Sequence, residues 1–356
     1  MSNSQGFKKL TISRRKLLAA GVGVAAAGPY VIVPGRALGA QQIVFVGYGG
    51  VNQEWYEKLM VAEFTKDTGV KVIMSSGPDL AKLKAQVMTK NVEWDIMTMS
   101  SGLAVGAERE GLLEKVDYSV VKWQDSIQPS RECTFPFYTY WGGVAFDPKR
   151  FPIDKVPKTW ADFWDAKKFP GRRGLRDRAD EMLEIALMAD GVPPKKLFPL
   201  DMDRAFKSLD RIKPHVAKFI AQTPQTISLV QTNEIDFSYA FAGRVDAAQK
   251  EGISMDFVSG QPLIISTFIG VPKGSKNREA AMKLMSYFAR PDMQAAYGNA
   301  LPGNGPIARA AMPMLSGKAK SMLPNADDPQ TAFVDMDWWA DNFAEATKRY
   351  KQWLLG

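Results

Sequence analysis

The amino-acid sequence predicts an α/β protein with two domains, and three observations support this prediction. A chain of 356 residues is long enough to build two domains, each with a hydrophobic core. Short apolar runs, typical of buried strands, alternate with longer segments in which apolar residues recur at helical spacing. No internal repeat interrupts the alternation. Strands that alternate with helices predict mostly parallel sheets with right-handed crossovers.

The first 40 residues are predicted to be a signal peptide of the twin-arginine type. Arg14 and Arg15 precede a mildly apolar stretch that ends in the small residues Gly39 and Ala40. A membrane anchor is the alternative, but glycines and prolines interrupt the stretch too often for a stable spanning helix. We expect cleavage after Gly39 or Ala40 and a mature protein in the periplasm.

Composition argues against nucleic-acid binding and against metal chemistry. Six of the 46 lysines and arginines lie in residues 1–40, which contain no acid, so the formal net charge falls from +8 to +2 for residues 41–356. One cysteine, Cys133, and one histidine, His215, provide neither a disulfide nor a pair of metal ligands. No nucleophile elbow, zinc-protease motif or Walker loop is present, so an enzyme is a disfavoured alternative and no cofactor is expected.

The first half of the mature chain alternates strands with helices. The predicted strands are 42–47, 70–74 and 95–99, and the predicted helices are 53–67, 79–89 and 100–111. Glycines mark the ends of two of these helices, since Gly69 follows the helix 53–67 and Gly111 ends the helix 100–111. An aromatic, extended segment follows at 133–146.

A second α/β set follows a short helix at 158–164, which Pro170-Gly171 separates from it. Its strands are predicted at 174–176, 216–220, 235–241 and 254–258, with a further apolar run at 263–271. Its helices are predicted at 179–190, 203–212, 223–232 and 243–251. Helices at 277–289 and 291–299, a Gly/Pro loop at 302–306 and a long helix at 331–352 complete the chain.

Five segments carry a resemblance to a known family. They read EFTKDTGVKV at 63–72, WDI at 94–96 with REGLL at 109–113, WGGVAF at 141–146, TWADFW at 159–164 and VPKGSKN at 271–277. With these segments in this order, the chain resembles the bacterial extracellular solute-binding proteins. That family includes the spermidine/putrescine-binding and the ferric-ion-binding proteins. The resemblance covers nearly all of residues 41–345.

The resemblance implies a two-lobed periplasmic-binding-protein fold of type II, in which each lobe is a mixed, mostly parallel sheet flanked by helices. Lobe one is then expected at 41–142 plus 263–320 and lobe two at 143–260, with the C-terminal helical segment 321–356 packing across both. Hinges are expected near 141–145 and 260–265. The implied function is that of the binding component of an ABC (ATP-binding cassette) importer. Such a component is expected to be a monomer that delivers a small molecule to a membrane permease and binds no nucleic acid.

Lobe one offers two loops at the expected cleft. Tyr48 follows the first strand, and Ser100 and Ser101 follow the third. Ligands of open α/β sheets bind at the carboxyl ends of strands, and a helix N-terminus favours an anionic group. Ordinary turns and caps would explain the same residues, since serine and glycine are common there.

Lobe two departs from the polyamine-binding pattern. The family's Asp-Ala-Arg-Glu stretch, whose acids hold ammonium groups, corresponds to residues 178–181: Glu181 keeps the acid, but Arg178 replaces the aspartate. Its later Trp-x-Asp corresponds to Ile-Ser-Thr at 265–267. Further cleft candidates are Trp141, Phe241 and Arg244.

One acid, an arginine and two helix N-termini suit a small zwitterion, such as a γ-amino acid or an aminophosphonate. Polyamine binding is the alternative, and a solvated charge cluster around Arg178 is a further one. Ferric-ion binding is disfavoured because the chain lacks the paired neighbouring tyrosines of the iron binders.

Overall fold

The computed structural model describes residues 41–122 and 125–356, so the predicted signal peptide at 1–40 lies outside the described residues. Within the described part, ten strands form one mixed sheet whose main path runs β2-β1-β3-β8-β4-β7-β5-β6, with β9 and β10 as side branches. The strands are β1 (Gln42–Gly47), β2 (Lys71–Ser76), β3 (Ile96–Met99), β4 (Thr134–Phe146), β5 (Arg173–Arg176), β6 (Val216–Ile220), β7 (Phe237–Phe241), β8 (Asp256–Gly270), β9 (Asn304–Pro306) and β10 (Ala332–Phe333).

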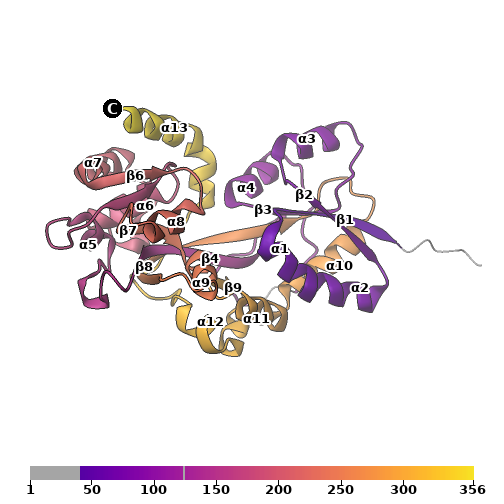
Figure 1. Ribbon diagram of the computed structural model, residues 1–356. Helices are drawn as coiled ribbons and strands as arrows, with labels where there is room; N and C mark the ends of the chain where they lie inside the picture. The colour runs from indigo at the N-terminus through magenta and orange to yellow at the C-terminus, as the bar shows by residue number, and fades with distance from the viewer. Residues whose placement is uncertain (1–40, 123–124) are drawn as a thin grey trace, which may run out of the picture. The chain divides into compact units, whose positions relative to one another are not determined.

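Helices cover this sheet in two groups (Figure 1). With lobe one lie α1 (Gly50–Tyr56), α2 (Ala62–Thr68), α3 (Leu80–Met88), α4 (Ser101–Arg109) and α10 (Arg278–Ala289). With lobe two lie α5 (Trp160–Trp164), α6 (Met182–Ala189), α7 (Met202–Ile212), α8 (Gln225–Gln231) and α9 (Ala242–Lys250). The C-terminal part adds α11 (Pro291–Ala300), α12 (Gly317–Met322) and α13 (Met336–Leu355).

Each lobe has a parallel strand set and a core of its own. In lobe one β1 pairs with β2 and β3 in parallel, and Phe45, Phe64 and Phe288 are among its buried side chains. In lobe two β5 pairs with β6 and β7 in parallel, and the apolar residues of α6 pack into a second core. Two separate cores agree with the two-lobed fold that the sequence predicts.

The long strands β4 and β8 belong to both lobes. They pair antiparallel with each other, while β8 also pairs with β3 in lobe one and β4 with β7 in lobe two. Their register breaks between Gly142 and Val144, inside the predicted hinge regions. A Cβ on Gly142 would lie 2.1 Å from the Tyr239 hydroxyl, and one on Gly143 would lie 2.5 Å from the Val258 carbonyl oxygen. Only glycine permits this close approach of backbone at the crossing.

Some predicted elements differ from the structure. The predicted loop 302–306 contains the short strand β9, because Asn304–Pro306 pair with β4. The predicted strand 254–258 and the apolar run 263–271 are one continuous strand, β8, because the chain crosses between the lobes without leaving the sheet. The last helix begins at Met336 rather than at 331, because residues Ala332–Phe333 pair with β8 as β10 and Asp335 caps the helix. No helix among the described residues has the length and apolarity needed to span a bilayer.

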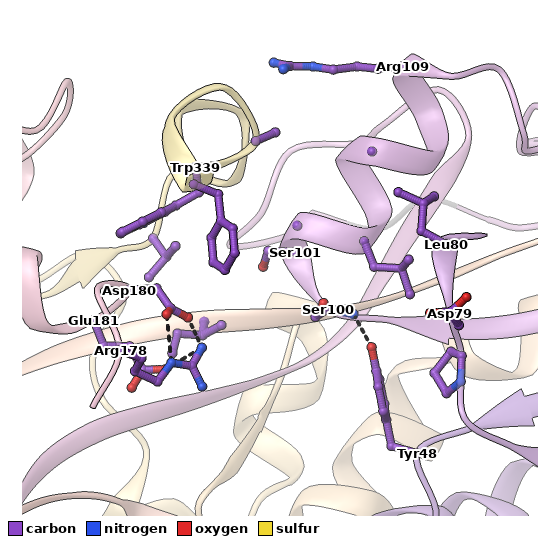
Figure 2. Close-up of a pocket in the computed structure, with 18 of the residues that line it drawn as sticks. Tyr48, Asp79, Leu80, Ser100, Ser101, Arg109, Arg178, Asp180, Glu181 and Trp339 are labelled. Carbon is purple, nitrogen blue, oxygen red and sulfur yellow. Dashed lines mark hydrogen bonds and ion pairs between the residues drawn. The ribbon is translucent and has the colours of Figure 1, made fainter. Parts of the chain in front are cut away.

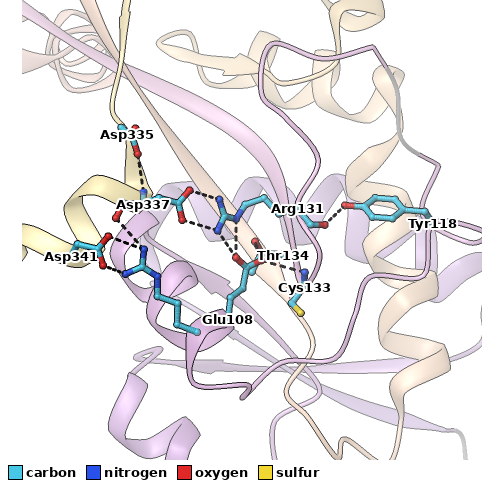
Figure 3. Close-up of polar contacts among 9 residues, drawn as sticks. Glu108, Tyr118, Arg131, Cys133, Thr134, Asp335, Asp337 and Asp341 are labelled. Carbon is cyan, nitrogen blue, oxygen red and sulfur yellow. Dashed lines mark hydrogen bonds and ion pairs between the residues drawn. The ribbon is translucent and has the colours of Figure 1, made fainter. Parts of the chain in front are cut away.

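Helix α13 contacts both lobes. Arg109 of α4 and Arg131, which precedes β4, donate to Asp341 and Asp337 in the first half of α13 (Figure 3). In its second half, the Tyr350 hydroxyl donates to the Arg176 carbonyl oxygen of β5 at 2.8 Å. The C-terminal helix therefore connects lobe one to lobe two across the cleft.

Candidate ligand-binding cleft

A cleft of about 740 Å³ lies between α4, α6 and α13 (Figure 2). Lobe one contributes the loop after β1 and the first turns of α3 and α4, and lobe two contributes the turn before α6. Tyr140 of β4 and Ile265 of β8 also line the cleft, as does one face of α13. A volume of this size lies in the range that binds small organic ligands.

Around the start of α4, the lobe-one edge of the cleft presents uncharged groups. The backbone N–H of Ser100 donates to the Tyr48 hydroxyl at 2.9 Å, which fixes the tyrosine over the start of α4. Ser101 donates from its hydroxyl to the Ser266 carbonyl oxygen at 3.3 Å. The first N–H groups of a helix have no partner within that helix, so the start of α4 offers donors to an anionic group.

The lobe-two edge presents charges. The Arg178 guanidinium donates from Nε to Asp180 at 2.8 Å and lies 3.8 Å from Glu181. Glu181 immediately precedes α6 and has a φ of 73°, a left-handed conformation that costs free energy for a residue other than glycine. This backbone geometry turns the Glu181 side chain into the protein, where 3% of it remains exposed.

Burial changes the protonation of the Glu181 carboxyl. Desolvation raises the pKa of Glu181, while the positive charges of Arg178 and then Arg176 oppose the rise. One carboxylate oxygen, Oε2, makes no hydrogen bond of good geometry among the described residues, although the buried Tyr239 hydroxyl lies close enough to Glu181 to lower the pKa of its carboxyl. A buried acceptor without a partner costs free energy, so this oxygen is suited to receive a donor from a ligand.

Arg176 lies beneath this edge on β5. Its guanidinium is 5.9 Å from the Phe241 ring centroid, and burial lowers its pKa. Nε and Nη1 of Arg176 are buried without a hydrogen-bond partner in the part of the chain that the structure describes. Two arginines and two acids, Arg176, Arg178, Asp180 and Glu181, thus form a cluster whose formal charges cancel.

The other charged residues of the cleft already have partners. Asp79 accepts from the Lys82 backbone N–H at 2.7 Å, and Glu110 pairs with Lys84 at 2.7 Å. Arg109 pairs with Asp341 of α13. The cluster at lobe two differs from these pairs because Oε2 of Glu181 and Nε and Nη1 of Arg176 are buried without a hydrogen bond of good geometry in the described part of the chain. No group of residues that could hold a metal ion is found among residues 41–122 and 125–356.

Comparison with known proteins identifies the family. Residues 59–325 match the family model described as bacterial extracellular solute-binding protein. The chain belongs to this family.

Curated relatives of this binding protein are named as binding proteins for amino compounds. It is 29% identical to the gamma-aminobutyric acid-binding protein of Pseudomonas aeruginosa, over 88% of this chain and 91% of that protein. It is 24% identical to the spermidine/putrescine-binding periplasmic protein of Escherichia coli, over 83% of this chain and 86% of that protein. Because the family consists of binding components of ABC importers, this binding protein is a periplasmic transport component that delivers a small ligand to a membrane permease, and it is not an enzyme.

Solved structures agree with the two-lobed fold. An ABC transporter substrate-binding protein from Bradyrhizobium japonicum matches with a TM-score of 0.81 and 33% identity, covering 88% of this chain and 99% of that one. The structure of a GABA receptor matches with a TM-score of 0.79 and 30% identity, covering 88% and 97%.

The structure of the binding protein brings five of the eight sequence-predicted site residues to one cleft, namely Tyr48, Ser100, Ser101, Arg178 and Glu181. They come from three separate loops, which the order of the strands in the sheet places together. Their contact with a ligand stays a prediction.

Three predicted site residues lie outside the lining of this cleft. Trp141 is 1% exposed and packs against Ala242 and Ile264, because side chains alternate along β4 and its neighbour Tyr140 faces the cleft instead. Phe241 packs edge-on against the Tyr140 ring at 5.2 Å, outside the lining. Arg244 is exposed on α9, which Figure 1 draws below β4 and β8, whereas α13 lies above them.

Sequence reasoning missed Arg176, Asp180, Tyr140 and the α13 residues of the cleft. The charged run around Arg178 contains both Arg176 and Asp180, so a signal for these two was present. Trp339 of α13 both packs in the core of lobe two and lines the cleft.

Proposed function

We propose that this binding protein captures a small zwitterionic amino acid of the γ-aminobutyrate type between its two lobes. The observation that carries the proposal is the cluster of two arginines and two acids at lobe two. A ligand of no net charge matches a cluster of no net charge. The similarity to a GABA-binding protein and to a GABA receptor supports the same ligand class.

The two ends of such a ligand have complementary groups. An ammonium group can donate to the unpaired Oε2 of Glu181, which removes the cost of leaving that oxygen without a partner. A carboxylate or phosphonate can accept from Arg178 and from the first N–H groups of α4 beside Ser101. The ligand then joins lobe one to lobe two, which favours the closed arrangement.

Polyamines suit this cluster less well. A linear diamine carries positive charges only, and Arg178 stands where the polyamine-binding relatives have an acid. A second ammonium group near Arg178 would be repelled and would find no free carboxylate. The similarity to polyamine-binding relatives keeps putrescine and spermidine as the competing ligands.

The remaining parts of the proposal concern movement and export. The lobes are taken as 41–142 with 263–320 and 143–260, and 321–356 as the segment packed across them. They close by bending at β4 and β8, where the register break and the paired glycines lie.

The protein acts as a monomer, without nucleic acid, and reaches the periplasm by the twin-arginine route.

Isothermal titration calorimetry of residues 41–356 tests the ligand class. We expect 4-aminobutanoate or 3-aminopropylphosphonate to bind at least about tenfold more tightly than putrescine or spermidine, because one misplaced charge at a buried site is worth that factor or more. Tighter binding of the polyamines would overturn the proposal. Binding of none of these compounds would also overturn it.

A further inference from the structure

The cleft has an apolar wall that the polar ends of a small amino acid do not use. Helix α13 lines it with Trp339, Ala340 and Phe343, and α4 faces this helix with Leu103 and Gly106. The Trp339 and Phe343 rings pack edge to face, with centroids 6.2 Å apart. Phe343 is 51% exposed, so about half of its side chain remains accessible to a molecule in the cleft.

This wall is continuous with the charged cluster. Figure 2 shows Trp339 above Asp180 and Arg178, on the helix that borders the cleft opposite Ser101. Leu80, Ile265 and Val334 extend the apolar lining toward the middle of the cleft. The charged cluster of lobe two is thus bordered by hydrocarbon surface on α13, beyond which Arg109 pairs with Asp341.

Contacts with both lobes hold the wall in place. The Trp339 indole N–H donates to Glu184 of α6 at 2.6 Å, one turn after Glu181. On the lobe-one side, Arg131 donates to Asp337 at 3.0 Å and to Glu108 of α4 at 2.9 Å (Figure 3). A side chain whose supporting helix is anchored on two sides is presented to a ligand in a fixed position.

The cleft in this arrangement has room for a substituent beside a γ-amino acid. Its volume of about 740 Å³ falls in the range of pockets that enclose drug-sized molecules. Apolar side chains that line a ligand site gain free energy when a ligand removes their surface from water.

We infer that α13 forms a second, apolar subsite, and that Phe343 and Trp339 determine specificity for ligands with an alkyl or aryl substituent. The inference rests on the proposed function, since the zwitterionic end must occupy the charged cluster for the substituent to reach α13. The ligand class is then an amino acid with separated charged ends and an apolar side group.

Two probes with the same charged ends test this subsite, 4-aminobutanoate and 4-amino-3-phenylbutanoate. In titration calorimetry of residues 41–356 we expect the phenyl compound to bind about tenfold or more tightly, as a buried ring in an apolar pocket allows. The variant Phe343→Ala should remove this gain and leave the dissociation constant of 4-aminobutanoate within about twofold. Leu355→Ala, on the same helix but 89% exposed and outside the cleft, is the matched control and should change neither constant.

The outcomes separate the subsite from the proposed function. If 4-aminobutanoate binds and the phenyl compound binds equally or more weakly, the apolar wall does not receive a ligand group and the inference is overturned, while the proposed function stands. Equal weakening of both probes by Phe343→Ala would likewise overturn it, since that pattern reports a structural role. Absence of binding by both probes in the unmodified protein would overturn the proposed function and this inference together.

Discussion

The two edges of the cleft differ in the chemistry that they offer. Lobe one presents a tyrosine hydroxyl, serine hydroxyls and the start of α4, whereas lobe two presents buried ions. Hydroxyls and backbone N–H groups can bind many kinds of polar ligand, but a buried carboxylate between two arginines discriminates between ligands by their charge. We therefore expect lobe one to contribute to capture of a ligand and lobe two to determine selectivity.

Glu181→Gln should have the largest effect on this difference. The change leaves Arg176 and Arg178 without their buried counter-charge and removes the acceptor for an ammonium group. We expect the affinity for 4-aminobutanoate to fall about 300-fold, about 3.4 kcal/mol, as is typical when one partner of a buried charge pair is removed. Titration calorimetry measures this loss of affinity. Butanoate, which lacks the ammonium group, is the control ligand, and its affinity should not fall. An unchanged constant for 4-aminobutanoate would remove Glu181 from the site.

Glu184, a second buried acid of lobe two, should lower the free energy of unfolding at neutral pH. Burial raises the pKa of Glu184 from 4.5 to about 7. The folded state therefore binds more protons than the unfolded state in this window, so the free energy of unfolding falls as the pH rises through it. Glu184→Gln keeps an acceptor for the Trp339 indole N–H but cannot ionise.

Urea unfolding at pH 4 and pH 8 measures the effect. We expect the stability of Glu184→Gln relative to the unmodified protein to increase by about 3 kcal/mol between these pH values, which is the shift from 4.5 to about 7 expressed as free energy. A difference that stays constant with pH would mean that the Glu184 carboxyl titrates normally.

Arg178→Ala should have an intermediate effect. Its side chain is 42% exposed, so solvent weakens its contribution compared with that of Glu181. We expect about a tenfold loss of affinity for 4-aminobutanoate and a relative gain for putrescine, because the change exposes Glu181 to ammonium groups. Lys218→Ala, which breaks the exposed pair with Glu234 in the same lobe, is the control. Equal losses for both ligands would contradict a charge-selecting role.

Tyr48→Phe, in lobe one, should have the smallest effect. The change removes an exposed hydroxyl that accepts from the Ser100 N–H, and such hydrogen bonds contribute little in net terms. We expect a loss of affinity of about threefold, with the preference between 4-aminobutanoate and putrescine unchanged. A change in the ratio of the two affinities as large as that expected for Arg178→Ala would contradict the different roles expected of the two lobes.

The order of the elements could be predicted from the sequence because local signals mark their ends. Gly69, with a φ of 71°, ends α2 where the pattern predicts, and Thr159 with Asp162 caps α5. The continuous strand β8, which is shared by the two lobes, could not be predicted in the same way. Two apolar runs separated by Gly260 give no local sign that they form one strand, β8, because only pairing with β4 makes them continuous.

The site was predictable where a loop follows a strand and unpredictable where side chains meet through tertiary packing. Ser100 and Glu181 each stand just before a helix that begins at the cleft. Phe343 of α13 lines the same cleft as Glu181 and Arg178 through the fold alone, because no spacing in the sequence connects α13 with the turn before α6. Trp141 was misplaced because the strand register that decides which face it occupies was not known.

The sharing of β8 between the lobes sets an order for assembly. Strands β5, β6 and β7 come from one nearly continuous stretch, so the sheet of this half can form while the ribosome is still making the chain. The sheet of the other half needs β8, because Met97 of β3 pairs with Gly270. The core of lobe two is in turn completed by Tyr350 of α13, so both halves need segments from late in the chain and the long-range contacts that slow folding.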